Sequence, residues 1–451
     1  MKTLHYVMIG AATGSALVLL ATSPKVEPLI SRALAAPLAD SADAATTYRE
    51  LSLLGRVFEA VRQDYVDKPD SDKLIQSALS GMIGGLDPHS SYMDAKAFAE
   101  MQVETTGQFG GLGMEVTTEN NLVKVVSPID GTPAAKAGIL AGDVITQIDG
   151  KPIDKLSLGD VVAKLRGSVG SKVTLDIQRA KVAKPVVVTL TREIIQVRPV
   201  SSRAEGGDVG YIRIKEFNEL TNDELKSAIA DLSSKIPADK LKGYIVDLRN
   251  NPGGLLDQAV GVVNDFLSQG EIVSTRGRDA GDDERFFAKP QLGDLIHGKP
   301  LIVLINGGSA SASEIVSGAL QDQKRATIVG SRSFGKGSVQ TIMPLGAGNG
   351  ALRLTTARYY TPSGRSIQAE GITPDITVLQ NVPKELQDSE AEVSEASLPG
   401  HFHAQGKEEK GSQAYVPPKP EDDTALQTAL ALMRGTKHDA AFPPKRQQAA
   451  R

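Results

Sequence analysis

Four serines lie close together after a short apolar segment, at positions 309, 311, 313 and 317. The apolar residues 301–305 predict a buried strand, Gly307-Gly308 predicts a tight turn, and the apolar pattern over 315–320 predicts a helix. A helix N-terminus has free backbone N–H groups and a dipole that favours developing negative charge, so a serine placed there can act as a nucleophile. Helix capping is the alternative role, because serine is a favoured N-cap residue.

A lysine lies in a second cluster, Ser333-Phe334-Gly335-Lys336-Gly337-Ser338-Val339-Gln340. None of the six histidines lies in either cluster, although folding could bring His89 or His297 close. Burial lowers the pKa of a lysine by penalising its charged form, and the neutral amine can then serve as a general base. Gln340 shares a face with Lys336 and can orient the amine without adding charge. A solvated surface lysine is the alternative.

The two motifs, GSASASEI and FGKGSVQ, resemble those of the C-terminal processing peptidases, also called tail-specific proteases, which are S41 serine peptidases with a PDZ domain. The resemblance implies that Ser311 is the nucleophile and that Lys336, twenty-five positions later, is the general base. It also implies that Gln340 assists the lysine. It covers roughly residues 45–380, so it extends well beyond the two motifs.

Strands and helices alternate through residues 199–380, which predicts a layered α/β domain. The resemblance implies that this domain is a Ser–Lys protease core of the ClpP/crotonase-like type. The fold class expected for the whole chain is therefore multi-domain α/β, with an inserted PDZ domain and an N-terminal helical segment.

The stretch Arg249-Asn250-Asn251-Pro252-Gly253-Gly254 is similar to a glycine motif of the same family. Glycine lets the backbone approach a substrate oxygen closely, so the N–H groups of Gly254 and Ala312 are the expected oxyanion hole. Asp257 and Glu314 are expected to be solvated or to interact with a helix dipole, because Ser–Lys chemistry needs no carboxylate.

Residues 104–198 resemble a PDZ domain. Gly111-Leu112-Gly113-Met114 is similar to the loop whose backbone N–H groups hold a terminal carboxylate, and the strand that begins at Met114 offers an edge to a peptide. A helix beside this groove is expected to present Leu158, Val162 and Leu165. The expected partners are therefore protein substrates with free, apolar C-termini.

The N-terminus resembles an export signal. Residues 6–21 are apolar and rich in small residues, and Ala33-Leu34-Ala35 is a candidate cleavage site. Residues 1–35 are accordingly expected to be a signal peptide or an uncleaved anchor. Either role places the protein outside the cytoplasm, in the periplasm, soluble or tethered to the inner membrane. Residues 45–103 show the apolar periodicity of helices.

The C-terminal residues 381–451 are expected to form a flexible linker, rich in Glu, Lys, Ser, Gln and Pro, followed by a helical tail. The helix expected over 421–433 is a candidate contact with another subunit or a partner. His401 and His403 form a two-residue pair that is expected to be solvated, because a metal site needs a third ligand.

Composition narrows the remaining choices. The chain has 451 residues, 50 basic and 54 acidic side chains and no cysteine, which excludes a disulfide framework and thiolate catalysis and does not suggest nucleic-acid binding. The function expected is an exported serine endopeptidase that needs no metal or organic cofactor. A homo-oligomer formed through terminal helices and an adaptor protein are further expectations. The alternatives are a catalytically silent PDZ scaffold and a crotonase-like acyl-CoA enzyme.

Overall fold

The computed structural model describes residues 41–119, 122–180, 182, 184–291, 293–387 and 393–445. The chain divides into two compact units, residues 1–78 and 79–451. The proposed signal or anchor, residues 1–35, lies outside the described residues. Among the residues that are described, no helix combines the length and the apolar character needed to cross a membrane.

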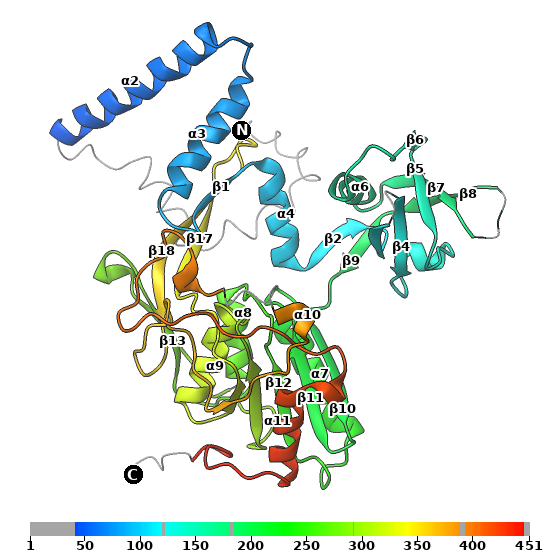
Figure 1. Cartoon of the computed structure of the whole chain (residues 1–451), viewed down its shortest axis with the longest axis vertical. Helices are drawn as coiled ribbons and strands as arrows, with labels where there is room; N and C mark the ends of the chain where they lie inside the picture. The colour runs from blue at the N-terminus through cyan, green and yellow to red at the C-terminus, as the bar shows by residue number, and fades with distance from the viewer. Residues whose placement is uncertain are drawn as a thin grey trace, which may run out of the picture. The chain divides into compact units, whose positions relative to one another are not determined.

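The N-terminal helical region contains α2 (Ser41–Asp64) and α3 (Ser71–Gly84), followed by α4 (Ala95–Thr106) (Figure 1). The apolar positions of α2 are open to solvent within its own unit: Leu51, Leu54 and Val57 are 57%, 54% and 52% exposed. The helical periodicity of this region therefore predicted its secondary structure correctly, whereas the apolar face of α2 is not covered by its own unit.

A six-stranded sheet forms the centre of the second unit. Its order is β10 (Val200–Glu205), β11 (Val209–Ile214), β12 (Gly243–Asp247), β15 (Leu301–Ile305), β16 (Thr327–Gly330) and β19 (Ile376–Thr377). The strands from β11 to β19 are parallel, and β10 pairs antiparallel with β11. Every residue of β12 and β15 is buried, as expected for parallel strands covered on both faces.

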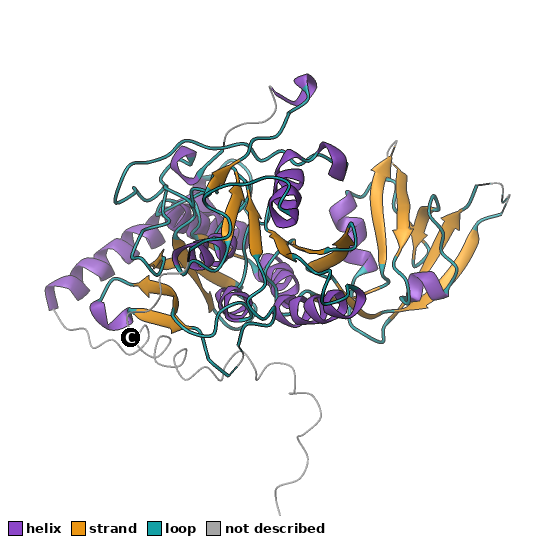
Figure 2. Ribbon diagram, turned by 90° about the horizontal axis from the view of Figure 1, so that it is seen from below, coloured by secondary structure: helices purple, strands orange, loops and turns teal. Residues whose placement is uncertain are grey.

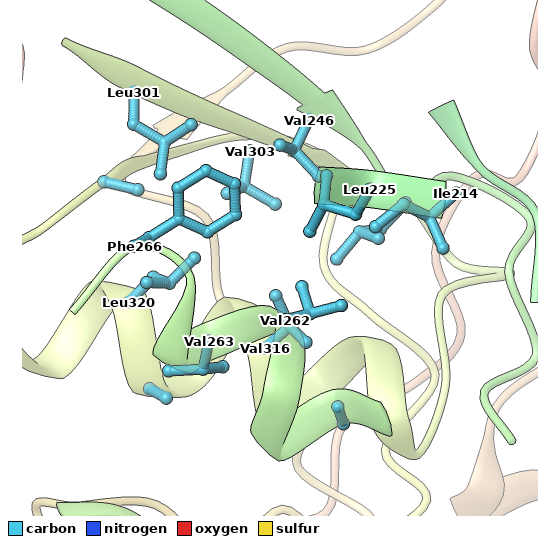
Figure 3. Close-up of a cluster of buried hydrophobic side chains, with 14 of the residues drawn as sticks. Ile214, Leu225, Val246, Val262, Val263, Phe266, Leu301, Val303, Val316 and Leu320 are labelled. Atoms are coloured by element: carbon cyan, nitrogen blue, oxygen red, sulfur yellow. The ribbon is translucent and has the colours of Figure 1, made fainter. Parts of the chain in front are cut away.

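Helices cover both faces of this sheet. On one face lie α7 (Thr221–Lys235), α8 (Leu256–Asn264) and α9 (Ala312–Asp322), and their apolar side chains share a core with Val246 and Val303 of the strands. Figure 3 shows Val262, Phe266 and Val316 facing the strand side chains across this core. The opposite face packs against α11 (Thr424–Arg434), and the layered α/β fold expected for the chain is thereby confirmed.

The packing of α11 corrects one expectation. Leu426, Leu430 and Met433 are buried against the sheet of their own chain, with Ile302 and Leu304 among their neighbours. The apolar face that was expected to contact another subunit is therefore used within the chain.

A second, antiparallel sheet extends the core. Its strands are β1 (Ser91–Met93), β18 (Ala351–Tyr360), β13 (Glu271–Arg276) and β14 (Glu284–Phe287), and β17 (Ser338–Pro344) pairs with β18. The loop that carries Lys336 enters this sheet at β17.

The PDZ-like region is a separate small sheet with its own core. The sheet order is β3 (Met114–Glu119), β4 (Leu122–Pro128), β5 (Val144–Ile148), β7 (Lys172–Gln178) and β8 (Val186–Thr191), with β6 (Lys151–Pro152) beside β5. Figure 2 shows these strands gathered into one sheet. The helices are α5 (Pro133–Lys136) and α6 (Leu158–Leu165), and β2 (Gln108–Gly111) pairs with β9 (Glu193–Gln196) at the two ends of the region.

The C-terminal segment 393–419, which we call the strap, differs from the flexible linker that was expected. Its backbone is hydrogen-bonded to the core: Gly307 donates to Gln413 O at 3.0 Å, and Glu409 donates to Ala369 O at 3.0 Å. Arg332 pairs with Glu409 at 2.7 Å. The strap is held by polar contacts rather than by a large apolar face, which is why its composition resembled that of a linker. The short helix α10 (Lys384–Gln387) precedes it.

Candidate functional site

Ser311 occupies a strained turn between β15 and α9. It is the N-cap residue of α9 with φ 53° and ψ −113°, a positive φ that few residues other than glycine adopt. Its side chain is nearly buried, at 5% exposure for the residue. A serine on a sharp strand-to-helix turn is the geometry of a nucleophile elbow.

The hydroxyl groups of the neighbouring serines are hydrogen-bonded to backbone carbonyls. The Ser309 hydroxyl donates to Leu248 O at 2.8 Å, that of Ser313 to Asn251 O at 3.0 Å, and that of Ser317 to Ser313 O at 2.8 Å. Within the described part of the chain, the Ser311 hydroxyl donates to no carbonyl. Ser311 is therefore the serine of this cluster whose hydroxyl is available for chemistry.

Two unpaired amides belong to the segments beside Ser311. Gly253 packs against the turn so closely that a Cβ on it would lie 2.8 Å from Ser311 Cβ and 3.0 Å from Ala312 N. Its own N–H donates to Asn251 Oδ1 at 2.9 Å. The next amide, of Gly254, and the amide of Ala312 donate to no acceptor among the described residues. These are the two groups predicted for the oxyanion hole.

Glycine is required at both positions of the turn. Gly253 and Gly254 have φ of 104° and 140°, and a Cβ on Gly254 would lie 2.2 Å from Phe217 O. A side chain at either position would separate this loop from its neighbours. The absence of side chains at Gly253 and Gly254 therefore allows this loop to pack directly against the turn that carries Ser311.

Lys336 lies on the loop before β17 in a largely enclosed position. Burial lowers the pKa of its amine, and the nearby Arg353 guanidinium lowers it further, while the carboxylates of Glu395 and Glu314 act in the opposite direction. The net shift favours the neutral amine, which is the form that can accept a proton. The N–H of Gly337, the residue after Lys336, donates to Gln368 Oε1 at 3.1 Å and holds the loop on that side of the lysine.

Glu314 joins the two halves of the site, and sequence reasoning missed this role. Its carboxylate is fully buried and accepts the N–H of Ser311 at 2.8 Å, of Gly335 at 2.7 Å and of Lys336 at 2.9 Å. The Ser333 hydroxyl donates to it as well. Burial raises the pKa of Glu314 to about 7, against the effect of these four donors.

The expectation of a solvated Glu314 was therefore wrong, although its position in the first turn of α9 agrees with the helix-dipole role. The available signal was the spacing Ser311-x-x-Glu314, which is that of a capping box. Asp257, by contrast, is exposed, as expected.

Gln340 lies on β17 and is hydrogen-bonded to side chains of β17 and β18. Its amide Nε2 donates to Ser338 Oγ at 3.0 Å and to Thr355 Oγ1 at 3.2 Å. No hydrogen bond joins its side chain to Lys336 within the described residues. In this structure the Gln340 side chain links β17 to β18.

His89 has a structural role, as the turn-forming residues around it indicated. Its Nε2 lies 2.8 Å from the buried carboxylate of Glu395, which belongs to the strap. Asp87, two residues before His89, accepts from Thr355 Oγ1 at 3.1 Å and from the Ser90 hydroxyl at 2.6 Å. The turn therefore supports the strand that Gln340 also contacts, and the ring nitrogen is already paired.

The loop expected to bind a carboxylate has the required free donors. The N–H groups of Leu112 and Gly113 have no acceptor among the described residues, and β3 is an edge strand that is open to a further strand on one side. Gly113 has φ 74°, and a Cβ there would lie 2.3 Å from Thr132 Cβ. After α6, Arg166 stacks over the Phe109 ring at 4.2 Å, which places a cation next to the strand that leads into this loop.

The groove helix α6 only partly follows expectation. Leu158 and Val162 retain accessible surface, whereas Leu165 is 6% exposed and belongs to the core of the domain. Leu165 is therefore a packing residue, and the apolar surface that α6 can offer a ligand reduces to Leu158 and Val162.

Three family models match the chain. Peptidase family S41 matches residues 208–378, a PDZ domain matches residues 124–179, and the N-terminal domain of the activating protease CtpB matches residues 8–97. Together these matches account for the protease core, the inserted domain and the helical N-terminal region.

Individual proteins are also similar. A carboxy-terminal-processing protease of Bartonella bacilliformis is 58% identical over 400 residues, which are 88% of this chain and 91% of that protein. The carboxy-terminal processing protease CtpA of Bacillus subtilis is 35% identical over 83% of this chain and 77% of its own. Among solved structures, the photosystem II D1 C-terminal processing protease is 31% identical and covers 73% of this chain and 93% of its own, with a TM-score of 0.42.

Proposed function

We propose, from the premise that this chain belongs to the carboxy-terminal-processing proteases of peptidase family S41, that it cleaves proteins by a Ser311–Lys336 mechanism and selects them by their C-terminal tails. The observation that carries the proposal is the position of Ser311. Ser311 lies on a strained turn, and in the described structure its hydroxyl donates to no neighbouring carbonyl. Two backbone amides in the segments around it, those of Gly254 and Ala312, have no acceptor among the described residues.

In the first step, the neutral amine of Lys336 removes the proton from Ser311 Oγ as the oxygen attacks the scissile carbonyl carbon. The negative charge that collects on the carbonyl oxygen is held by the N–H groups of Gly254 and Ala312. The protonated amine then gives its proton to the leaving nitrogen as the peptide bond breaks, which leaves an acyl group on Ser311.

In the second step, water attacks the acyl group, and Lys336 accepts a proton from that water. The tetrahedral intermediate collapses, the bond to Ser311 Oγ breaks, and the lysine returns the proton to the serine. Every proton transfer in the proposed cycle is made by Ser311, Lys336 and water, so the cycle needs no metal ion and no organic cofactor. Gln340 contributes by fixing β17, the strand that follows the lysine loop.

Substrate selection is assigned to the PDZ domain. A terminal carboxylate would accept from the N–H groups of Leu112 and Gly113 in the loop Gly111-Leu112-Gly113-Met114, and the peptide backbone would pair with the open edge of β3. Leu158 and Val162 favour an apolar last residue. Arg166 supports the choice of a charged carboxylate by lying beside the strand that leads into the loop.

The proposed cellular site is outside the cytoplasm. The support is the apolar segment 6–21 followed by Ala33-Leu34-Ala35, which is typical of an export signal or anchor. Fractionation of cells that express the full chain tests this directly, because a protein found only in the cytoplasmic fraction would contradict it.

The test of function is cleavage of an unfolded protein substrate, with the new termini identified by mass spectrometry. The wild-type chain should release fragments near the C-terminus, and Ser311→Ala and Lys336→Met should each lose at least roughly a thousandfold in kcat, because nucleophile and base act as a unit. Lys240→Met is the matched control, since Lys240 is an exposed lysine outside the site. Cleavage by Ser311→Ala at the wild-type rate would contradict the proposal.

A further inference from the structure

Two histidines and a glutamate meet on the strap. His401 Nε2 lies 3.3 Å from Glu408 Oε1, and His403 Nδ1 lies 2.8 Å from the same oxygen. The three ligand atoms all lie within 4.8 Å of one another. The sequence alone shows a pair of histidines, and the third group arrives because the chain turns back between residues 404 and 407.

The ring of His401 has the orientation that a metal ligand needs. Its Nδ1 lies 2.8 Å from Leu398 O, and a carbonyl oxygen can only accept, so Nδ1 carries the hydrogen. The lone pair of the neutral ring is then on Nε2, which faces Glu408. Metal-ligating histidines show this arrangement, in which the second ring nitrogen donates to a carbonyl or carboxylate.

One of the donor separations already suits a small tetrahedral ion, and a second comes close. Zinc binds nitrogen and carboxylate oxygen at about 2.0–2.2 Å, which places neighbouring donor atoms about 3.3–3.5 Å apart. The separation between His401 and Glu408 already has this value, at 3.3 Å. The separation between His403 and Glu408 must widen by about 0.5 Å to reach it. The side chain of His403 is 85% exposed, so it is free to make this movement and an ion can enter from solvent.

We propose that His401, His403 and Glu408 form a binding site for a divalent transition-metal ion of the Zn²⁺ type, with water as the fourth ligand. Two imidazoles and one carboxylate favour zinc and its neighbours over Mg²⁺ and Ca²⁺, which prefer sets of oxygen ligands. This site is separate from the Ser311 chemistry, which uses no metal.

The ion would bridge residues 401–408 of the strap, a segment that is connected by hydrogen bonds to the loop of Lys336. Phe402 O, between the two histidines, accepts from Gln368 Nε2 at 3.0 Å. Gln368 Oε1 in turn accepts the N–H of Gly337, the residue after Lys336. Bound metal should therefore stiffen the strap where it is hydrogen-bonded to the support of the lysine loop.

The experiment is a zinc titration of the purified full-length chain after removal of metal with a chelator, read as competition with a chromophoric zinc indicator. We expect one zinc per wild-type chain and at least tenfold weaker binding for His403→Ala and for Glu408→Gln. Loss of a residue that only supports a metal ligand costs about 10–100-fold in affinity, and loss of a ligand itself should cost no less. His438→Ala and Glu421→Gln are matched controls, because both residues are exposed and lie outside the cluster. They should bind zinc as the wild type does, and Mg²⁺ should not compete.

Hydrogen exchange provides a second measurement that does not depend on activity. Zinc should slow exchange of the amides over residues 398–410 in the wild-type chain and leave them unchanged in Glu408→Gln. Failure of the wild-type chain to take up zinc would overturn the proposal. Undiminished uptake by both His403→Ala and Glu408→Gln would overturn it equally, because the ion would then be bound elsewhere.

Discussion

The backbone N–H of Ser311 donates to Oε2 of Glu314 across 2.8 Å, inside the first turn of α9. The same oxygen accepts the N–H of Lys336 at 2.9 Å, although the lysine comes from a different loop. One buried carboxylate thus holds the backbone of the proposed nucleophile and the backbone of the proposed base. Their relative position depends on Glu314, which reaches the substrate in neither step of the mechanism.

Replacing Glu314 by glutamine should disturb the relative position of Ser311 and Lys336 while leaving substrate binding nearly unchanged. An amide offers one acceptor oxygen and places an NH₂ group against N–H donors, so at least one buried donor loses its partner at about 1–3 kcal/mol. We expect a lower melting temperature and a kcat reduced roughly tenfold to a hundredfold, with KM nearly unchanged. Steady-state kinetics and thermal unfolding measure both effects.

Asp257→Asn is the matched control for that change, since Asp257 is an exposed acid on the neighbouring helix α8. It should leave kcat and stability at their wild-type values. Wild-type kcat in Glu314→Gln would show that the shared carboxylate does not position the pair.

Activity should rise with pH and then level off. The base must be neutral, and burial holds the pKa of Lys336 below the ordinary lysine value of 10.5, so the rise follows that lowered pKa. The unfolded chain binds the proton more tightly than the folded one. Stability should therefore also increase with pH between the lowered pKa and 10.5.

The measurement is kcat/KM as a function of pH for the wild-type chain and for Glu314→Gln. Burial raises the pKa of Glu314 to about 7, so its ionisation could produce a similar rise. If Lys336 is the base, the rise persists in Glu314→Gln. An activity that is highest in acid and falls toward neutrality would exclude a lysine base.

His89→Gln should leave the pH dependence of the reaction intact. The ring is already paired with Glu395 at 2.8 Å, so its loss removes a contact between the strap and the core rather than a catalytic group. We expect a lower melting temperature and an unchanged shape of the pH–rate curve. Loss of the ascending limb in this variant would instead point to a histidine base.

The tail of the substrate should control its cleavage. An amidated tail lacks the charged carboxylate to which the N–H groups of Leu112 and Gly113 would donate, a loss of about 1–3 kcal/mol or roughly tenfold or more in affinity. An aspartate at the end should also weaken binding beside Leu158 and Val162. One unfolded substrate with free apolar, amidated and Asp-terminated tails makes the comparison. Equal rates on all three would mean that the PDZ domain does not select by the free C-terminus.

The parts of the fold that the sequence predicted well are those set by local patterns. The apolar run Leu301–Ile305, the following glycines and the apolar helical spacing of α9 are close in the chain, and they place Ser311 on its turn. Gly253 and Gly254 could be assigned to a close backbone approach for the same reason, since only glycine tolerates their φ angles.

The parts that the sequence did not predict are contacts between polar groups far apart in the chain. Glu314 meets Gly335 and Lys336 across the fold, and Glu395 of the strap meets His89 from the start of the unit. Such contacts leave no periodicity, because one carboxylate satisfies several donors wherever the backbone brings them. Apolar burial was misjudged at Leu165, where the helix spacing fits both the groove and the core, and at α11, whose apolar face packs on the sheet of its own chain.

The central claim, that Ser311 is the nucleophile and Lys336 its base, is tested most directly by covalent labelling with a serine-reactive fluorophosphonate, followed by peptide mass mapping. The label should appear on Ser311 in the wild-type chain and in Ser313→Ala, and its rate should rise with pH. Lys336→Met should lose labelling, while the control Lys240→Met should keep it. A label on another serine, or undiminished labelling of Ser311 in Lys336→Met, would contradict the account.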